Sequence, residues 1–349
     1  MAYTTIDDPS AYFQTDLYTG TGSSLANTFD GNSDMQPDWV WIKERNGATD
    51  HALYDSSRGV QEQLESNTTT AETTEATGLT AFGSDGFTVG ALAQVNTSSD
   101  TYVAWNWKAN GGTTASNTDG DITSTVQVNS DAGFSIVTDS PPNNTARSIG
   151  HGLGVAPQVI IRRARNRVEN WRVFHSAAGS TGALMLDNAD AYNSSIVLFT
   201  GVTSTTFGVG TDFSVNGNFN YISYCFAEVQ GYSKFSSYVG NGVANNGPFV
   251  YLGFKPRFLM IKSTTDTGSH VIWDSKRSPF NGMDDYLVAA EADAEGTNGI
   301  FTIDAVSNGF KIRNTGANNG LNQDATKYVY YAFAENPFTT STGIPATAR

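Results

Sequence analysis

The sequence is poor in cysteine, histidine, charged residues and long hydrophobic runs. Of 349 residues only 15% are charged, and there are four histidines and one cysteine, Cys225. A single cysteine excludes an intrachain disulfide, and no Cys/His group shows the spacing of metal ligands. The longest apolar runs are strand-sized, far short of a membrane-spanning helix. We therefore expect no metal, no cofactor and no membrane insertion.

Basic residues are also scarce, and this narrows the range of partners. Lys and Arg number 20 against 34 Asp and Glu, which gives a formal net charge of −14. Such a charge repels nucleic acid and anionic membranes at long range, so no nucleic-acid binding is expected. The segment from Met1 to Pro9 has neither a basic start nor an apolar stretch. We therefore expect no secretory signal and synthesis in a cytoplasm.

Glycine, aromatic residues and the small polar residues are abundant instead. The chain has 35 glycines and an aromatic fraction of 12%. Turn formers combined with β-branched and aromatic residues are typical of β-structure, and segments rich in Lys and Glu are nearly absent. The length allows two or three domains, each large enough to have its own core.

An internal repeat is the most informative feature. Each copy begins at a proline, continues with an apolar run that ends in a cation, and has an aromatic and then a polar residue at positions 17 and 18 after the proline. The prolines, cations and polar residues are Pro37, Lys43 and Asp55; Pro157, Arg163 and His175; and Pro256, Lys262 and Asp274. A second matched run closes each copy, at residues 102–107, 221–226 and 328–333. A motif that occurs three times indicates a building unit before it indicates a catalytic site.

The repeat predicts the domain organisation. We expect a first β unit at residues 1–112, a linker with a crossing strand at 113–132, a second unit at 133–231, a third at 232–338 and a mobile tail at 339–349. The fold class is all-β, with three tandem antiparallel β-sandwich or jelly-roll-like units and few short helices.

Local patterns add detail within each unit. Trp39 and Trp41 alternate with Val40 and Ile42, which predicts a strand buried on both faces. A six-residue polar segment follows each such strand, as expected of a hairpin loop, and the proline is expected just ahead of the strand. Asp85-Gly86 and Asn308-Gly309 are further hairpin signals. Helices are expected at 284–294 and, as a second candidate, at 70–76.

Several longer motifs resemble repeats of uncharacterised virion-associated proteins of marine tailed bacteriophages. These motifs are Tyr18–Gly22, Ile149–Gly154, Cys225–Glu228 with Gly231–Phe235, and Ala332–Phe338. The likeness extends over nearly the whole chain. It implies a structural protein of the tail, a fibre or the capsid surface, and it carries over no functional residues.

One basic cluster in this acidic chain is the candidate binding site. Three of its arginines lie in or beside the hairpin loop of the second unit, and guanidinium groups suit either carboxylates of an adjoining subunit or anionic sugars. The alternative is a solvated hairpin with Glu169 as local partner. Arg163 has cationic counterparts in the other repeats and is assigned to the scaffold. The candidate ligand- or partner-binding residues are Arg162, Arg165, Arg167, Trp171 and Arg172, with Trp171 as the best exposed aromatic.

No residue is predicted to be catalytic. His51 and Asp55 lie four residues apart, as do His270 and Asp274, so each pair is separated by ~13 Å along a strand. Calcium ligation at 119–121 or 187–190 is an alternative to Asx turns there. The acidic residues between 284 and 295 are interpreted as a solvated helix face, and Cys225 as a small buried side chain.

The sequence therefore favours a non-enzymatic structural component of a tailed-phage virion, located in the virion after synthesis in the host cytoplasm. Expected partners are other virion proteins and further copies of the chain, with a trimer favoured. A host-surface glycan-binding adhesin is the alternative, and a glycan-degrading tailspike enzyme is a third.

Overall fold

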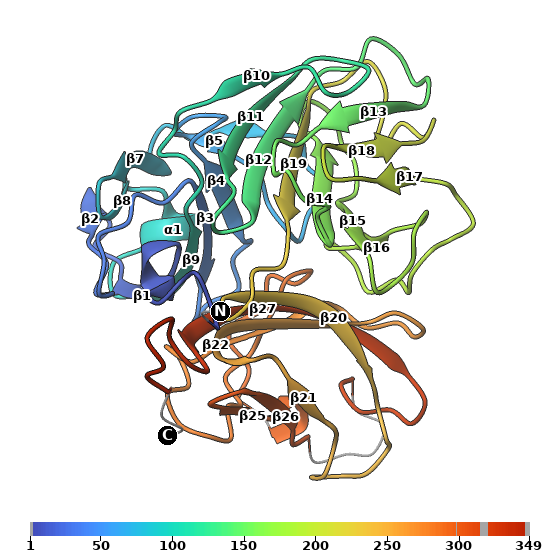
Figure 1. Ribbon diagram of the computed structural model, residues 1–349. Coiled ribbons are helices and arrows are strands. Elements are labelled where there is room, and N and C mark those ends of the chain that lie inside the picture. Colours follow the sequence, from blue (N-terminus) through green and yellow to red (C-terminus); the bar gives the residue numbers. More distant parts are fainter. Residues whose placement is uncertain (1–2, 298, 315–319, 346–349) are drawn as a thin grey trace.

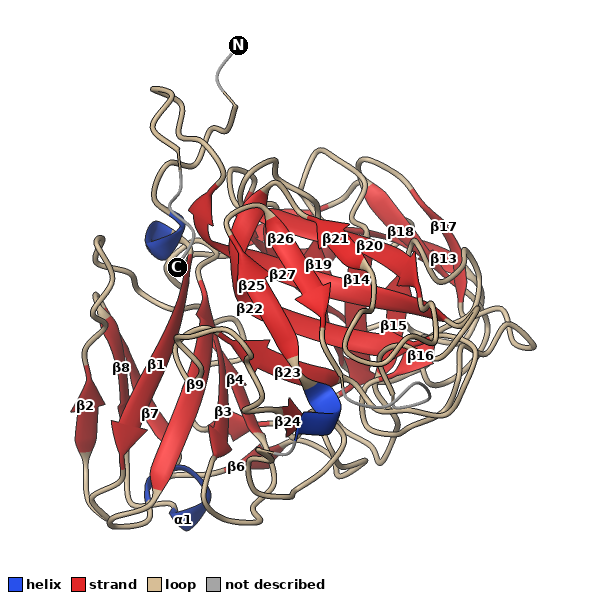
Figure 2. Ribbon diagram, turned by 90° about the horizontal axis from the view of Figure 1, so that it is seen from below, coloured by secondary structure: helices blue, strands red, loops and turns tan. Residues whose placement is uncertain are grey.

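The regular secondary structure of the protein is almost entirely antiparallel β-sheet, as seen in a computed structural model (Figures 1 and 2). The structure describes residues 3–297, 299–314 and 320–345. Helix is confined in these ranges to three short pieces, η1 (Pro9–Ala11), α1 (Ala93–Asn96) and η2 (Gly299–Phe301). The all-β prediction is confirmed.

The sheets form three groups, and in each group side chains of one large and one small sheet share a hydrophobic cluster. We call these groups the first, second and third sheet pair. In the first, the large sheet has the order β1 (Phe13–Thr19), β9 (Thr101–Trp107), β3 (Trp39–Glu44), β4 (Ala52–Asp55). The small sheet has the order β2 (Leu25–Asn27), β8 (Gly86–Val89), β7 (Leu79–Gly83), and β5 (Glu62–Gln63) pairs separately with β6 (Thr73–Thr74).

The second sheet pair adds strands at both edges of its large sheet. The order is β10 (Ala115–Asn117), β11 (Ser124–Asn129), β12 (Phe134–Asp139), β19 (Tyr221–Phe226), β14 (Val159–Ala164), β15 (Arg172–His175), β16 (Leu184–Met185). The small sheet is β13 (Arg147–Gly150), β18 (Thr206–Val209), β17 (Phe199–Val202). The segment 113–132, predicted as linker and crossing strand, thus contributes β10 and β11 to this sheet.

The third sheet pair has the large-sheet order β20 (Ser233–Val239), β27 (Lys327–Pro337), β22 (Phe254–Ser263), β23 (Val271–Asp274), β24 (Leu287–Val288). Its small sheet is β21 (Phe249–Tyr251), β26 (Gly309–Ile312), β25 (Ile303–Val306). In all three large sheets the closing strand of the repeat lies between an opening strand and the proline-led strand. The matched runs of the sequence are therefore the central strands, which explains why they are apolar on both faces.

Each large sheet is buried on both faces. In β3, Val40 and Ile42 pack with Phe87 of the facing small sheet. Trp39 and Trp41 point to the opposite face and belong to a different cluster. Strands β14 and β22 show the same division between two clusters. The predicted two-sided burial of these strands is confirmed.

The second face of every large sheet contributes to one shared core. This core holds side chains of β3 and β9, of β14 and β19, and of β22 and β27, so all three sheet pairs meet around it (Figure 1). Trp39 stacks on Tyr224 with ring centroids 4.2 Å apart, and Phe13 stacks on Phe333 at 5.4 Å. An apolar void of about 10 Å³ remains at the centre.

Several local expectations need correction. Residues 284–294 are not helical: they include β24, which pairs with β23, and a turn at 289–290. The 70–76 segment contains β6. Edge pairing in these places overrides helix propensity. Pro256 lies inside β22 and not ahead of it, at a register shift between Lys255 and Phe258. A bulge tolerates proline because no ladder hydrogen bond is required of it there. The two predicted hairpins β7–β8 and β25–β26 are confirmed.

The two chain termini are tied together on the third sheet pair. The Tyr3 hydroxyl donates to the carbonyl of Gly253 at 2.7 Å. The Asp7 carboxylate accepts a hydrogen bond from the main-chain N–H of Ser341 at 2.6 Å. Of the segment predicted to be a mobile tail, 339–345 forms a turn closed by the Thr340 N–H and the Ile344 carbonyl, and 346–349 lie outside the described residues.

The shared core predicts that a charge within it is not tolerated. Ile161, 2% exposed, replaced by Asp should abolish the cooperative unfolding transition or lower its midpoint strongly, because an unpaired carboxylate in an apolar site costs several kcal/mol. Val168→Asp, at a position 67% exposed in the same hairpin, is the matched control. Urea unfolding followed by tryptophan fluorescence measures both, and equal midpoints would show that the shared core is not packed as described.

Candidate functional site

The predicted arginine cluster does not form one surface site. Arg162 is fully buried within the second sheet pair and makes a bidentate ion pair with Asp139, at 2.7 and 2.8 Å. Its Nε donates to the Val215 carbonyl at 2.8 Å, and the guanidinium lies 4.3 Å from the ring centroid of Tyr221. These contacts use most of its hydrogen-bonding capacity, so Arg162 has an internal structural role.

The other members of the cluster differ in exposure. Arg167 and Arg172 pair with Glu169 at 3.3 and 3.6 Å, which matches the alternative of a local partner. Trp171 is fully buried, which corrects the expectation of an exposed aromatic. Its Nε1 donates to the carbonyl of Glu65 in the first sheet pair at 2.7 Å. The sequence pattern failed because Trp171 follows a polar loop yet points into the shared core.

Arg165 instead binds a carboxylate of a neighbouring sheet pair. It contacts Glu72 of the first pair at 2.6 Å, and Glu72 also accepts from Arg58 at 2.8 Å. Arg277, Glu295 and Arg45 repeat this arrangement between the third and first pairs, at 2.9 and 2.7 Å. Burial raises the pKa of Glu72, but the hydrogen bonds from Arg165 and Arg58 together lower it by more, so the pKa of Glu72 lies below its usual value. Both arginine–glutamate–arginine groups are at most partly exposed.

The polar residue at position 18 of each repeat joins neighbouring sheet pairs in one direction around the core. Asp55 of the first pair accepts from the Tyr224 hydroxyl of the second at 2.7 Å. Asp274 of the third accepts from Trp105 Nε1 of the first at 3.0 Å. His175 of the second bonds to the Tyr330 carbonyl of the third at 3.2 Å. Three contacts thus close a ring, and we call these three boundaries the junctions.

The junction between the second and third pairs has no charge pair at these positions. Asp55 and Asp274 bind the arginine three residues later, Arg58 and Arg277, whereas His175 is followed there by Ala178. At this junction Tyr192 occupies the place that a glutamate has at the other two. The main-chain N–H of Tyr192 donates to the carbonyl of Thr264. In the same way, the N–H groups of Glu72 and Glu295 donate to the carbonyls of Arg165 and Arg45. Sequence reasoning missed Glu72, and it wrongly assigned Glu295 to a solvated helix face, whereas the side chain of Glu295 is 10% exposed and bound by two arginines. The segments before the two glutamates differ in length, so no gap-free match reveals their equivalence.

A second series of contacts runs in the opposite direction. His51 Nε2 of the first pair bonds to the Val288 carbonyl of the third at 3.1 Å. The corresponding contact of the second pair is the bond from Trp171 to Glu65 of the first. In the third pair, the ring of His270 interacts with the Met185 main chain of the second. The cations of the repeat lie beside these contacts. Arg163 donates to the carbonyls of Glu65 and Thr68 at 3.0 and 2.9 Å, and Lys262 donates to Gly268. Burial lowers the pKa of Lys43 and Lys262 to about 8 and that of Arg163 to about 10.

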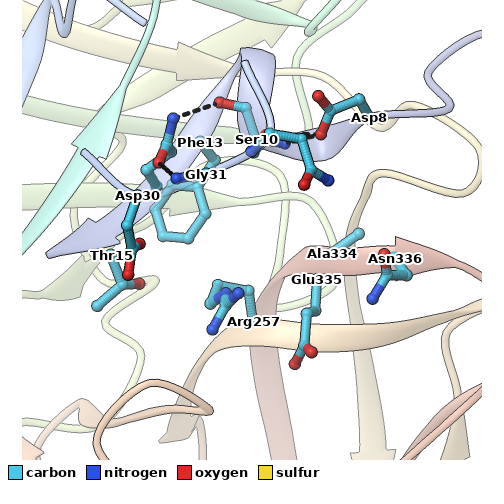
Figure 3. A pocket seen from close by; sticks show the side chains of 12 residues that line it. Asp8, Ser10, Phe13, Thr15, Asp30, Gly31, Arg257, Ala334, Glu335 and Asn336 are labelled. Carbon is cyan, nitrogen blue, oxygen red and sulfur yellow. Dashed lines mark hydrogen bonds between the residues drawn. The ribbon is translucent and has the colours of Figure 1, made fainter. Parts of the chain in front are cut away.

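A polar cavity of about 270 Å³ lies where the first and third sheet pairs meet (Figure 3). Its lining comes from η1, β1, the loop around Gly31, the bulge of β22 and the end of β27. Glu335 in its wall accepts from Lys255 and Ser275 at 2.8 and 2.7 Å. Burial opposes ionisation, yet Arg257 and Lys255 keep the pKa of Glu335 below its usual value. Sequence patterns gave no sign of this cavity.

The remaining candidates have structural partners. Asp187 accepts from Asn170 Nδ2 at 2.7 Å, and the Asn188 side chain accepts from the Asp190 N–H at 2.9 Å, which is an Asx turn. Cys225 is buried, and burial raises its thiol pKa to about 12. Across the described ranges no group of three His, Cys, Asp or Glu residues could hold a metal ion. No helix in this part of the chain is long and apolar enough to span a membrane.

Comparison with known protein families gives one match. The model of a family described as a domain of unknown function, DUF7483, matches residues 8–337. No curated protein and no solved structure matches the chain.

Comparison of the junctions predicts that the neutral residues of the second sheet pair, His175 and Ala178, can replace the charged Asp274 and Arg277 of the third. Arg277→Ala should destabilise the protein by about 3–5 kcal/mol, because it leaves the Asp274 carboxylate buried without its cation. The double variant Asp274→His/Arg277→Ala reproduces His175 and Ala178 and should recover part of this loss, since a neutral imidazole leaves no unpaired charge in the buried site. Chemical denaturation measures both variants. A double variant no more stable than the single one would contradict the equivalence of the junctions.

His175 predicts a specific acid sensitivity. Burial lowers its pKa from 6.5 to about 4, and its Nδ1 accepts from the Ala177 N–H, which requires a neutral ring. The unfolded chain therefore takes up this proton first as the pH falls below 6.5, and stability present at pH 7 is lost towards pH 4. Relative to His175→Gln, the wild type should lose about 3 kcal/mol of unfolding free energy over this range. If the unfolding free energies of the two proteins changed with pH in parallel, His175 would not titrate in this way.

Proposed function

The chain belongs to the DUF7483 family, and we propose that it is a non-enzymatic structural component of a tailed-phage virion. In this proposal it acts through protein–protein assembly as a tail-fibre, tail-associated or capsid-decoration protein. The resemblance of several motifs to repeats of virion-associated proteins supports the virion setting. The structural role rests on the position and the contacts of Asp55, His175 and Asp274. Each is fully buried at a junction and bonded to the next sheet pair.

We further propose that the three sheet pairs are tandem β-sandwich repeats that close on one another. The common strand order of the large and small sheets supports this, as do the matching positions of Pro37, Pro157 and Pro256. The junction contacts support it independently, because corresponding residues of each pair reach the next pair in the same sense. Such a closed block is suited to bearing load between neighbours in a particle, since no sheet pair can rotate without breaking two junctions.

Exposed apolar side chains support docking to other virion proteins. Phe280 is 76% exposed, and Phe249 and Tyr251 of β21 are 48% and 50% exposed, all in the third sheet pair. Aromatic side chains are enriched at protein interfaces and costly to leave in water. We propose that these side chains of the third pair contact a virion partner or further copies of the chain, with a trimer as the favoured assembly.

Purified particles test the proposal. Mass spectrometry of density-purified virions should detect the chain in many copies, and gold-labelled antibody should mark one fixed location. Phe280→Ser should reduce incorporation at least several-fold without changing the unfolding midpoint, because the side chain is exposed in the free protein. Val168→Ser, at a similarly exposed position of the second pair, is the control. A chain found only in the lysate and never in particles would overturn the virion role, and native mass spectrometry of the free protein reports the proposed trimer.

A further inference from the structure

Strand β21 lies at an edge of the small sheet of the third pair, so one of its two sides faces no other strand of that sheet (Figure 1). In an antiparallel pair, alternate residues direct both of their main-chain groups towards the partner strand. The Leu252 N–H donates to the Asn308 carbonyl, so Leu252 faces the neighbouring strand β26 and Val250, two residues earlier, does the same. Phe249 and Tyr251 therefore direct their N–H and C=O groups away from the sheet.

This free side of β21 is accessible to a partner. Phe249 and Tyr251 are 48% and 50% exposed. Within the described part of the chain, no hydrogen bond is found for either outward N–H group. The Tyr251 carbonyl accepts from Lys234 Nζ at 2.9 Å, which leaves its second lone pair free. An edge strand with unpaired main-chain groups and exposed apolar side chains is a template for pairing with another chain.

The second sheet pair shows how such an edge is covered. Strand β13 has the corresponding place in its small sheet, and the segment just before β11 lies against β13. Ile122 forms a parallel bridge to Ile149, and the Asp121 N–H donates to the Ser148 carbonyl at 3.0 Å. In the described ranges of the third pair, only the ammonium of Lys234 bonds to the main chain on the free side of β21. The strand position that is occupied in the second pair is thus open in the third.

We infer that a second copy of the chain occupies this position, with its own β21 antiparallel to the first across a two-fold axis at Val250. In this register Phe249 of each copy faces Tyr251 of the other, and each facing pair exchanges both N–H···O=C bonds. A shift of the register by two residues would leave only Phe249 or only Tyr251 paired within β21. The two small sheets become one continuous sheet.

The side chains of β21 favour a second copy as the partner. Each facing pair places two exposed aromatic rings opposite each other, and aromatic cross-strand pairs stabilise sheets. No like charges meet, because β21 has no charged residue and the other neighbours of Phe249 and Tyr251 are Lys311 and Gly309. The inference rests on the proposed contact between copies through the third pair and gives that contact two-fold symmetry. A trimer would need a different contact.

Sedimentation velocity of the full chain across the micromolar range tests the inference. We expect a monomer–dimer equilibrium that shifts towards dimer as salt is raised, because salt screens the repulsion between two chains of net charge −14. Tyr251→Pro should weaken dimerisation at least about tenfold, since it removes one N–H donor and one ring from each facing pair. Its unfolding midpoint should stay close to that of the wild type, because an edge strand tolerates proline on its free side. Val168→Ser, at an exposed position of the second pair, should dimerise as the wild type does.

Cysteine cross-linking tests the register independently of Tyr251→Pro. A mixture of Phe249→Cys and Tyr251→Cys should form a disulfide-linked dimer on oxidation, because the Cα atoms of such facing residues lie about 5.5 Å apart. Neither variant alone should cross-link, since its cysteine then faces an aromatic residue, and the buried Cys225 is common to all samples. Cross-linking by the single variants and not by the mixture would overturn the register.

The inference and the virion role fail separately. A chain that stays monomeric at all concentrations, a dimer unaffected by Tyr251→Pro, or a trimer without a dimer would overturn the inference, even if the chain is found in particles. A dimer of the predicted register in a chain that is absent from purified particles would overturn the virion role and support the inference.

Discussion

The structure depends on one constraint: each large sheet has two apolar faces, and its small sheet can cover only one of them. The uncovered face carries Trp39 and Trp41 in the first pair and Phe258 and Met260 in the third. A buried tryptophan removes 150–250 Å² from water, which amounts to about 4–6 kcal/mol as an upper estimate. A polar contact at a junction contributes about 1 kcal/mol net. Aromatic burial therefore drives the closure of three sheet pairs around one core, and the polar contacts fix how the pairs are rotated against each other.

The junctions show that the same geometry can be held by different chemistry. At two of them a buried aspartate is bound by an arginine three residues later, and the third uses His175 and Ala178. A buried ion pair adds little net stability, because both charges must be desolvated. Its retention at two junctions fits a role in specificity. Asp55 accepts from both Arg58 and Tyr224, and Asp274 accepts from both Arg277 and Trp105, so each carboxylate joins its own sheet pair to the next.

A closed ring made from one chain has an unavoidable asymmetry, since three junctions are served by only two covalent connections. At the third junction the N-terminal segment lies on the third sheet pair through Tyr3, and Ser341 binds Asp7. The polar cavity lies at this junction, where Arg257 replaces residues that elsewhere bind the departing chain. At the corresponding positions of the first and second pairs, Asp38 accepts from the N–H groups of Ala109, Gly111 and Gly112, and Gln158 accepts from the Glu228 N–H.

The sequence by itself determined the all-β class, the central strands and the positions of the hairpins, because alternation, turn residues and gap-free repetition are local properties. It also indicated that Asp55, His175 and Asp274 are equivalent. Only the tertiary structure decided what these residues contact, since their partners Tyr224, Tyr330 and Trp105 are more than 150 residues away. For the same reason the sequence placed Trp171 at the surface and left the cavity around Arg257 unseen. Burial and pockets are made by segments that meet only when the chain closes.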